Sequence, residues 1–178
     1  MMSPTALRML AVLALGVSAL SGCAPTPEPT PTPSPAFTSE EEAFAAAEAT
    51  FADYIDALNR VDTRDPTSFE PLFELSSGAV EAADRKNFSR MHAEGQTLSG
   101  ETTIIRFEGV ASDEPYERIQ AYSCLDVSDV EITNQDGSSA VSSDRPDVYA
   151  LELVLLRQAE GTLTIDSANR NKDVRCSD

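Results

Sequence analysis

The three cysteines carry the most reactive side chains of this chain, because a thiolate can be acylated, oxidised or bound to a metal. Cys23 follows a twelve-residue apolar run, Met9–Leu20, and two small residues. Such a run is too short to cross a bilayer core about 30 Å thick, which needs roughly 20 helical residues. It is typical of the apolar region of a cleavable secretion signal. The sequence therefore predicts that the chain is exported.

The segment ending in Leu20-Ser21-Gly22-Cys23 resembles the lipobox of bacterial lipoproteins. By that resemblance, Cys23 receives a diacylglyceryl group, and the signal peptide, residues 1–22, is removed after Gly22. A two-chain lipid anchor is sufficient for stable attachment. The resemblance thus implies a location on the extracytoplasmic face of the cell membrane. The alternative is an ordinary signal peptide followed by a chance cysteine.

Cys124 and Cys176 remain as a pair once Cys23 is assigned to the lipid. An exported chain meets an oxidising compartment, where a remaining even pair favours a disulfide. In the chain-entropy model, closing a loop of this length stabilises the fold by about 4 kcal/mol. The alternative is two free thiols. A redox or metal role is disfavoured, because the sequence has no CxxC spacing and only one histidine, His92.

The chain is strongly acidic, with a formal net charge of −17, and residues 1–22 contribute only one basic residue and no acid to it. This charge repels phosphate backbones, and no cluster of basic and aromatic residues is present to overcome it, which argues against nucleic-acid binding. No metal or cofactor is expected either. The acids within 126–136 lack the spacing of a calcium loop, and the sequence has no phosphate-binding glycine loop.

Proline occupies every second position from Pro25 to Pro35. Proline fixes φ and restricts the preceding residue to extended conformations. Residues 23–36 are therefore predicted to form a semi-rigid stalk that rises about 3 Å per residue. A proline-rich ligand for an aromatic groove is the alternative, but a stalk is favoured directly after a lipid anchor. Residues 37–178 have the length of one ordinary domain.

The pattern within residues 37–178 changes from helical to extended near Gly100. Capping residues and apolar residues at helical spacing predict helices over 39–61, 66–75 and 79–93. In the third helix we expect Val80, Ala83, Phe88 and Met91 to point inward. Alternating and β-branched residues predict strands over 102–110, 116–126, 148–156 and 163–167, and 127–132 can extend the second. Helices followed by antiparallel strands predict an α+β domain.

This order of elements resembles the NTF2-like (cystatin-like) superfamily, as found in lipoproteins of high-GC Gram-positive bacteria. The resemblance rests on the end of the first helix at 54–59, the short helix 69–75, Gly100, and the segment 121–128. It implies a cone of about three N-terminal helices packed on a curved antiparallel sheet of four or more strands. The short strand that the superfamily places near its third helix is not visible in the sequence.

The mouth of such a cone can hold a small molecule, and NTF2-like proteins include isomerases and cyclases that use a pocket carboxylate as base, besides many members without enzyme activity. A pocket base needs a desolvated carboxylate and a nearby donor. The candidate pocket residues are Tyr54, Tyr122 and Glu152, with Asp56 as a further acid. Glu152 lies in an apolar strand, so we expect it either on an open face or paired with Arg106 or Arg118.

No catalytic signature is present, and fold alone implies no function. We therefore expect a binding or interaction module of the cell envelope, which takes an envelope protein or a small ligand and has no catalytic residue. The alternative is a small-molecule enzyme, isomerase-like or dehydratase-like, with a carboxylate in the cone pocket. The resemblance also allows a homodimer, because many NTF2-like domains dimerise through their sheets.

Overall fold

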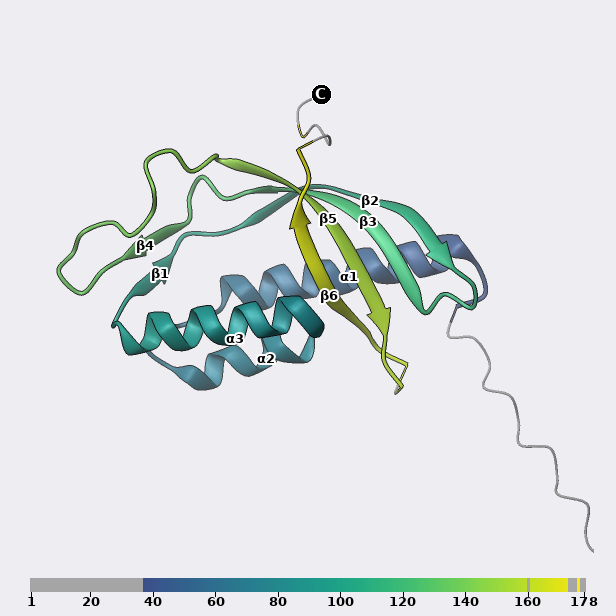
Figure 1. Ribbon diagram of the computed structural model, residues 1–178, viewed down its shortest axis with the longest axis horizontal. Helices are drawn as coiled ribbons and strands as arrows, with labels where there is room; N and C mark the ends of the chain where they lie inside the picture. Colours follow the sequence, from purple (N-terminus) through teal and green to yellow (C-terminus); the bar gives the residue numbers. More distant parts are fainter. Residues whose placement is uncertain (1–36, 160, 173–175, 177–178) are drawn as a thin grey trace, which may run out of the picture. The chain divides into compact units, whose positions relative to one another are not determined.

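The computed structural model describes residues 37–159, 161–172 and 176 (Figure 1). The predicted signal peptide 1–22, the lipidation site Cys23 and the stalk 23–36 lie outside the described residues. Among the described residues, no helix is both long and apolar enough to cross a membrane. The described residues lie within the predicted domain 37–178.

Within the described residues, three α-helices and one 3-10 helix form the first half of the domain. They are α1 (Glu40–Asn59), η1 (Pro66–Phe69), α2 (Glu70–Glu74) and α3 (Gly78–Ala93). Helix α1 begins at Ser39, whose hydroxyl accepts a hydrogen bond from the Glu42 amide at 3.2 Å, and the Glu42 carboxylate in turn accepts from the Thr38 amide at 2.8 Å. The predicted helices are thus confirmed, and a capping arrangement fixes the start of the first one.

In the part of the chain that the structure describes, six strands follow and form two antiparallel sheets. They are β1 (Thr97–Ser99), β2 (Thr103–Asp113), β3 (Arg118–Asp126), β4 (Glu131–Thr133), β5 (Val148–Arg157) and β6 (Leu163–Arg170). Strands β2, β3, β5 and β6 form the larger sheet in that order, and β1 pairs with β4. The predicted α+β class is confirmed, with the helices-on-sheet layout expected from the NTF2-like resemblance.

Two details of the sequence prediction are wrong. Residues 127–132 do not extend β3, because a turn at 127–130 separates it from β4, which pairs with β1 instead. Strand β1 lies directly after α3 and supplies the short strand that the sequence did not reveal. Both β1 and β4 have only three residues. This is too short for an alternation of apolar and polar residues to be recognised in the sequence.

The helices cover one face of the larger sheet (Figure 1). Helix α1 lays its apolar side on this inner face, and the core is made by the following buried residues: Ala43, Ala47, Phe51, Ile55, Val80, Ile119, Ala121, Leu125, Leu153, Leu155, Leu163 and Ile165. The Phe51 and Phe107 rings pack with their centroids 5.8 Å apart. This layer fills the space between α1 and the sheet with side chains.

Strand β6 lies at one edge of the larger sheet, and the segment between α2 and α3 forms backbone hydrogen bonds with it. The Ile165 amide donates to the Leu75 carbonyl at 3.0 Å, and the Ser77 amide donates to the Ile165 carbonyl at 2.9 Å. The opposite edge, β2, is interrupted by two register shifts, between Ile104 and Arg106 and between Gly109 and Ala111. Such bulges make an edge strand a poor template for pairing with another chain.

A disulfide joins Cys124 of β3 to Cys176, with 5.6 Å between the Cα atoms. This supports the pairing predicted from the sequence. It links residues separated by 52 positions in the chain and ties the C-terminal tail to the larger sheet.

Removal of this disulfide should lower the free energy of unfolding by about 4 kcal/mol, because the unfolded chain regains the entropy of the open loop. Urea unfolding of the C124A/C176A variant and of the reduced native chain measures this loss. The two losses should agree within about 1 kcal/mol. An unchanged stability on reduction would contradict the disulfide.

A methyl group at Gly109 should destabilise the domain, because a Cβ at this position would overlap the Phe44 ring. Overpacking of this kind costs about 1–3 kcal/mol. We expect Gly109→Ala to lower the free energy of unfolding, measured with urea, by that amount. In a chain that already carries Phe44→Ala, the same substitution should lower it much less. Equal losses in the two backgrounds would show that α1 does not approach β2 this closely.

Candidate functional site

The predicted pocket residues do not come together, because they lie on opposite faces of the larger sheet. Tyr54 belongs to α1 and packs against the core on the inner face. Tyr122 and Glu152 are direct cross-strand neighbours on β3 and β5. Side chains alternate between the two faces of a strand, and Ala121, Leu151 and Leu153 point inward, so Tyr122 and Glu152 point to the outer face.

Glu152 has no arginine partner among the described residues. Its carboxylate accepts a hydrogen bond from the Asn171 side chain at 3.3 Å. Arg106 pairs with Glu108 instead, and Arg118 lies opposite Leu156, several residues along β5. Glu152 was expected either on an open face or in an ion pair with an arginine, and it lies on the open outer face.

Tyr54 forms a half-buried hydrogen bond with an acid that the sequence analysis missed. Its hydroxyl donates to the Asp84 carboxylate of α3 at 2.9 Å. Burial raises the pKa of the Asp84 carboxyl to about 6, against a smaller opposite effect of the Tyr54 hydrogen bond. Burial also raises the pKa of the Tyr54 hydroxyl, and the charge of Asp84 adds to this.

The position of Asp84 could have been found from the helical period. Val80, Asp84, Phe88 and Met91 follow each other at intervals of four, four and three residues, so they share one side of α3. The other three are buried. Ala83 was expected on that side, but it is exposed. Hydrophobicity favoured alanine for the inward side of α3, although the helical spacing favoured Asp84.

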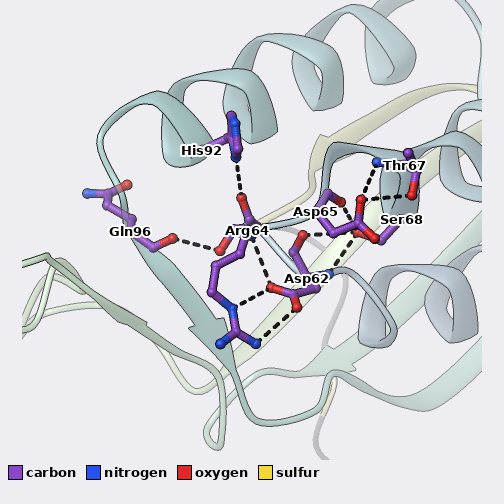
Figure 2. Close-up of polar contacts among 8 residues, drawn as sticks. Asp62, Arg64, Asp65, Thr67, Ser68, His92 and Gln96 are labelled. Atoms are coloured by element: carbon purple, nitrogen blue, oxygen red, sulfur yellow. Dashed lines mark hydrogen bonds and ion pairs between the residues drawn. The ribbon is translucent and has the colours of Figure 1, made fainter.

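His92 and Gln96 hold the loop that follows α1 (Figure 2). The buried Thr63 hydroxyl donates to the Gln96 carbonyl at 2.6 Å, and the His92 Nδ1 lies 2.8 Å from the Thr63 carbonyl. That carbonyl can only accept, so Nδ1 carries the proton. His92 is an exposed residue, and its side chain positions the loop that follows α1.

The same loop satisfies its own polar groups (Figure 2). The Asp62 carboxylate accepts from the Arg64 guanidinium at 2.9 and 3.0 Å. The Ser68 hydroxyl accepts from the amide of Asp62 at 2.9 Å, and Asp65 caps η1 through the Thr67 amide at 3.0 Å. Within the described residues, no group of three or more metal-ligating side chains occurs. This polar cluster therefore supports the loop.

Surface hollows lie away from the predicted pocket. The first, of about 480 Å³, is lined by Val148, Tyr149, Ala150, Arg170, Lys172 and the half-cystine Cys176, among others. A second, of about 420 Å³, lies between the end of α1 and β1, where Gly100 passes against the Asp129 carbonyl. Neither these two nor three further hollows are lined by Tyr54, Asp84, Tyr122 or Glu152.

No protein-family model and no curated protein matches the chain. Similar solved structures include the intermembrane space region of the chloroplast protein ARC6, with a TM-score of 0.50 and 11% identity over 71% of this chain and 95% of that chain. Others are Aln2 from a Streptomyces species, with a TM-score of 0.45 and 14% identity over 76% of this chain and 93% of that chain, and a ketosteroid isomerase-like protein from Erwinia carotovora atroseptica, with a TM-score of 0.45 and 14% identity over 71% and 93%. At such identities the likeness concerns the fold alone.

Substitution of Asp84 by asparagine should stabilise the domain at neutral pH. A folded pKa of about 6, above the ordinary 3.8, means that the fold favours the protonated acid. The native chain should therefore lose stability as the pH rises from about 4 to 6. Because Asp84 is only partly buried, we expect a loss of about 1 kcal/mol, less than the full shift implies.

Urea unfolding between about pH 4 and pH 7.5 measures this dependence. Asp84→Asn should remove the loss and keep the acceptor for Tyr54, whereas Asp56→Asn, at an exposed position of α1, should leave it unchanged. A pH profile of Asp84→Asn parallel to that of the native chain would contradict a desolvated Asp84.

Proposed function

We propose that the protein is a lipoprotein, anchored through Cys23 to the extracytoplasmic face of the cell membrane, whose domain binds an envelope component. The export signal and the cysteine that ends it support the anchor, and the proline-rich segment 23–36 supports a stalk that separates domain and membrane. The surface of an acidic domain is repelled by anionic headgroups over about one Debye length. The lipid would therefore provide the attachment.

The filled inner face of the sheet is the observation that favours binding over catalysis. Phe51 has an exposed fraction of 2%, and Ile119 and Leu155 have 0%. These side chains occupy the place where a cone pocket would have to open. None of the five surface hollows is lined by them. A partner would then be bound on the outside of the domain.

The outer face of the larger sheet is a broad surface that the helices leave uncovered (Figure 1). Tyr122 and Glu152 are half-buried there, and the Arg106–Glu108 ion pair lies on the neighbouring strand. Ile105 and Val110, at the two bulges of the β2 edge, have exposed fractions of 49% and 46%. A tyrosine among ionic groups and exposed aliphatic side chains is a surface suited to a protein partner.

An isomerase-like or dehydratase-like enzyme is the second candidate, and the Tyr54–Asp84 pair favours it. A desolvated carboxyl group with a pKa of about 6 can act as a base near neutral pH. Such a reaction requires the substrate to touch Asp84. Asp84 and Tyr54 do not line the five hollows described above, which favours binding over this reaction.

The anchor is tested by detergent phase partition of the full chain expressed in a bacterium that lipidates exported proteins. The native chain should enter the detergent phase and incorporate labelled fatty acid. Cys23→Ala should stay in the aqueous phase or retain an uncleaved signal. A native chain without label would refute the lipoprotein assignment, and a Cys23→Ala chain that is still fatty-acylated would refute Cys23 as the acylation site.

The binding role is tested by a photo-crosslinking amino acid introduced in place of Tyr122 in the full, membrane-anchored chain. A matched control carries it in place of Asn87, which is exposed on α3. We expect a discrete adduct from position 122 and none from 87, with Asp84→Asn leaving the adduct unchanged. Equal labelling from both positions, or loss of the adduct in Asp84→Asn, would contradict binding through the outer face.

A further inference from the structure

Glu152 is the one charged residue on the outer side of β5. Leu153 and Leu155 of this strand lie in the core on the inner side, and side chains alternate along a strand. The outward positions of β5 are Val148, Ala150, Glu152, Val154 and Leu156. The carboxylate therefore lies in the middle of an apolar stripe, on the face of the sheet that the helices leave uncovered (Figure 1).

The half-buried Tyr122 is the cross-strand neighbour of this carboxylate. Tyr122 and Glu152 are directly opposite in the register of β3 and β5, a relation that brings the Cβ atoms within about 5.5 Å of each other. On its other side Tyr122 is opposite Glu108 of β2, which is paired with Arg106. Within the described part of the chain, Glu152 forms no ion pair and accepts a hydrogen bond from the neutral Asn171 side chain. An aromatic ring beside a carboxylate is a surface that favours a cation.

The charge of Glu152 restricts which partner can cover the outer face. While the face is open, water solvates the carboxylate. A partner with only apolar groups above it would bury the carboxylate without a counter-charge, which is strongly unfavourable. A partner with a basic side chain at this point avoids that penalty. The formal charge of −17 also attracts a basic partner over a longer range.

We propose that the partner is a protein that places an arginine side chain against Tyr122 and Glu152. This rests on the proposed binding through the outer face and names the chemistry of the partner. A guanidinium group can stack on an aromatic ring and donate two parallel hydrogen bonds to a carboxylate, whereas an ammonium group is a point charge. Val154 and Leu156 beside the carboxylate supply apolar contact area around the arginine.

Fluorescence anisotropy of a labelled, end-capped tetra-arginine peptide tests this with the full chain in non-ionic detergent. A tetra-citrulline peptide has the same length but lacks the positive charge, so it should bind at least about 10-fold more weakly. Glu152→Gln should weaken the tetra-arginine peptide by at least about 5-fold and Tyr122→Leu by about 3-fold. Glu48→Gln, which removes an equal charge from an exposed position of α1, should change the affinity less than about 2-fold.

Equal losses in Glu152→Gln and Glu48→Gln would overturn the site, because they would show attraction by the overall charge alone. Arg175, which lies outside the described residues, is the competing occupant. Arg175→Gln should change the peptide affinity less than about 2-fold, and a large gain would show that the chain's own arginine fills the site.

The photo-crosslink from position 122 separates this inference from the binding role. In the membrane-anchored chain, Glu152→Gln should reduce the adduct strongly, and the crosslinked segment of the partner should contain an arginine. An adduct that Glu152→Gln leaves unchanged, or a segment without a basic residue, would contradict the arginine partner and leave the binding role standing. Absence of any adduct from position 122 would contradict the binding role itself.

Discussion

The packing of α1 against the concave face of the sheet is the constraint on which the rest of the structure depends. Ala43 and Ala47 are fully buried at this contact, and Gly109 lets the Phe44 ring approach β2 closely. The small residues bring the helix near, and Phe51 and Phe107 then fill the remaining space. Dense side-chain packing of this interior supports the proposal that a partner is bound on the outside of the domain.

The polar groups of the domain follow from that arrangement. Burial desolvates Asp84 of α3, and Tyr54 of α1 donates a hydrogen bond to it. Tyr122 and Glu152 face outward because their neighbours on β3 and β5 form the core. Arg170 and Lys172 lie where β6 ends and the disulfide-bound tail begins. Packing thus separates the Tyr54–Asp84 pair on the inner side from Tyr122 and Glu152 on the outer face.

The sequence predicted the parts of this molecule that depend on local pattern. The helix start at Ser39, the alternation of Ile119, Ala121 and Ser123 in β3, and the pairing of Cys124 with Cys176 agree with the structure. It did not predict what depends on register and topology. Tyr54, Tyr122 and Glu152 suggested one pocket, but only the strand register shows that two of them point away from the third. The contact of Arg170 with the Tyr149 ring likewise joins two segments that no local pattern links.

Xenon titration of the methyl-labelled chain by NMR tests the filled interior most directly, because an apolar cavity binds xenon. The methyl groups of Ile119, Leu153 and Leu155 report on the inner face, where each residue has an exposed fraction of 0%. The packed interior predicts no saturable shift at these three residues. Saturable shifts there would reveal an internal cavity, contradict the binding-module account and return the Tyr54–Asp84 pair to consideration as a catalytic site.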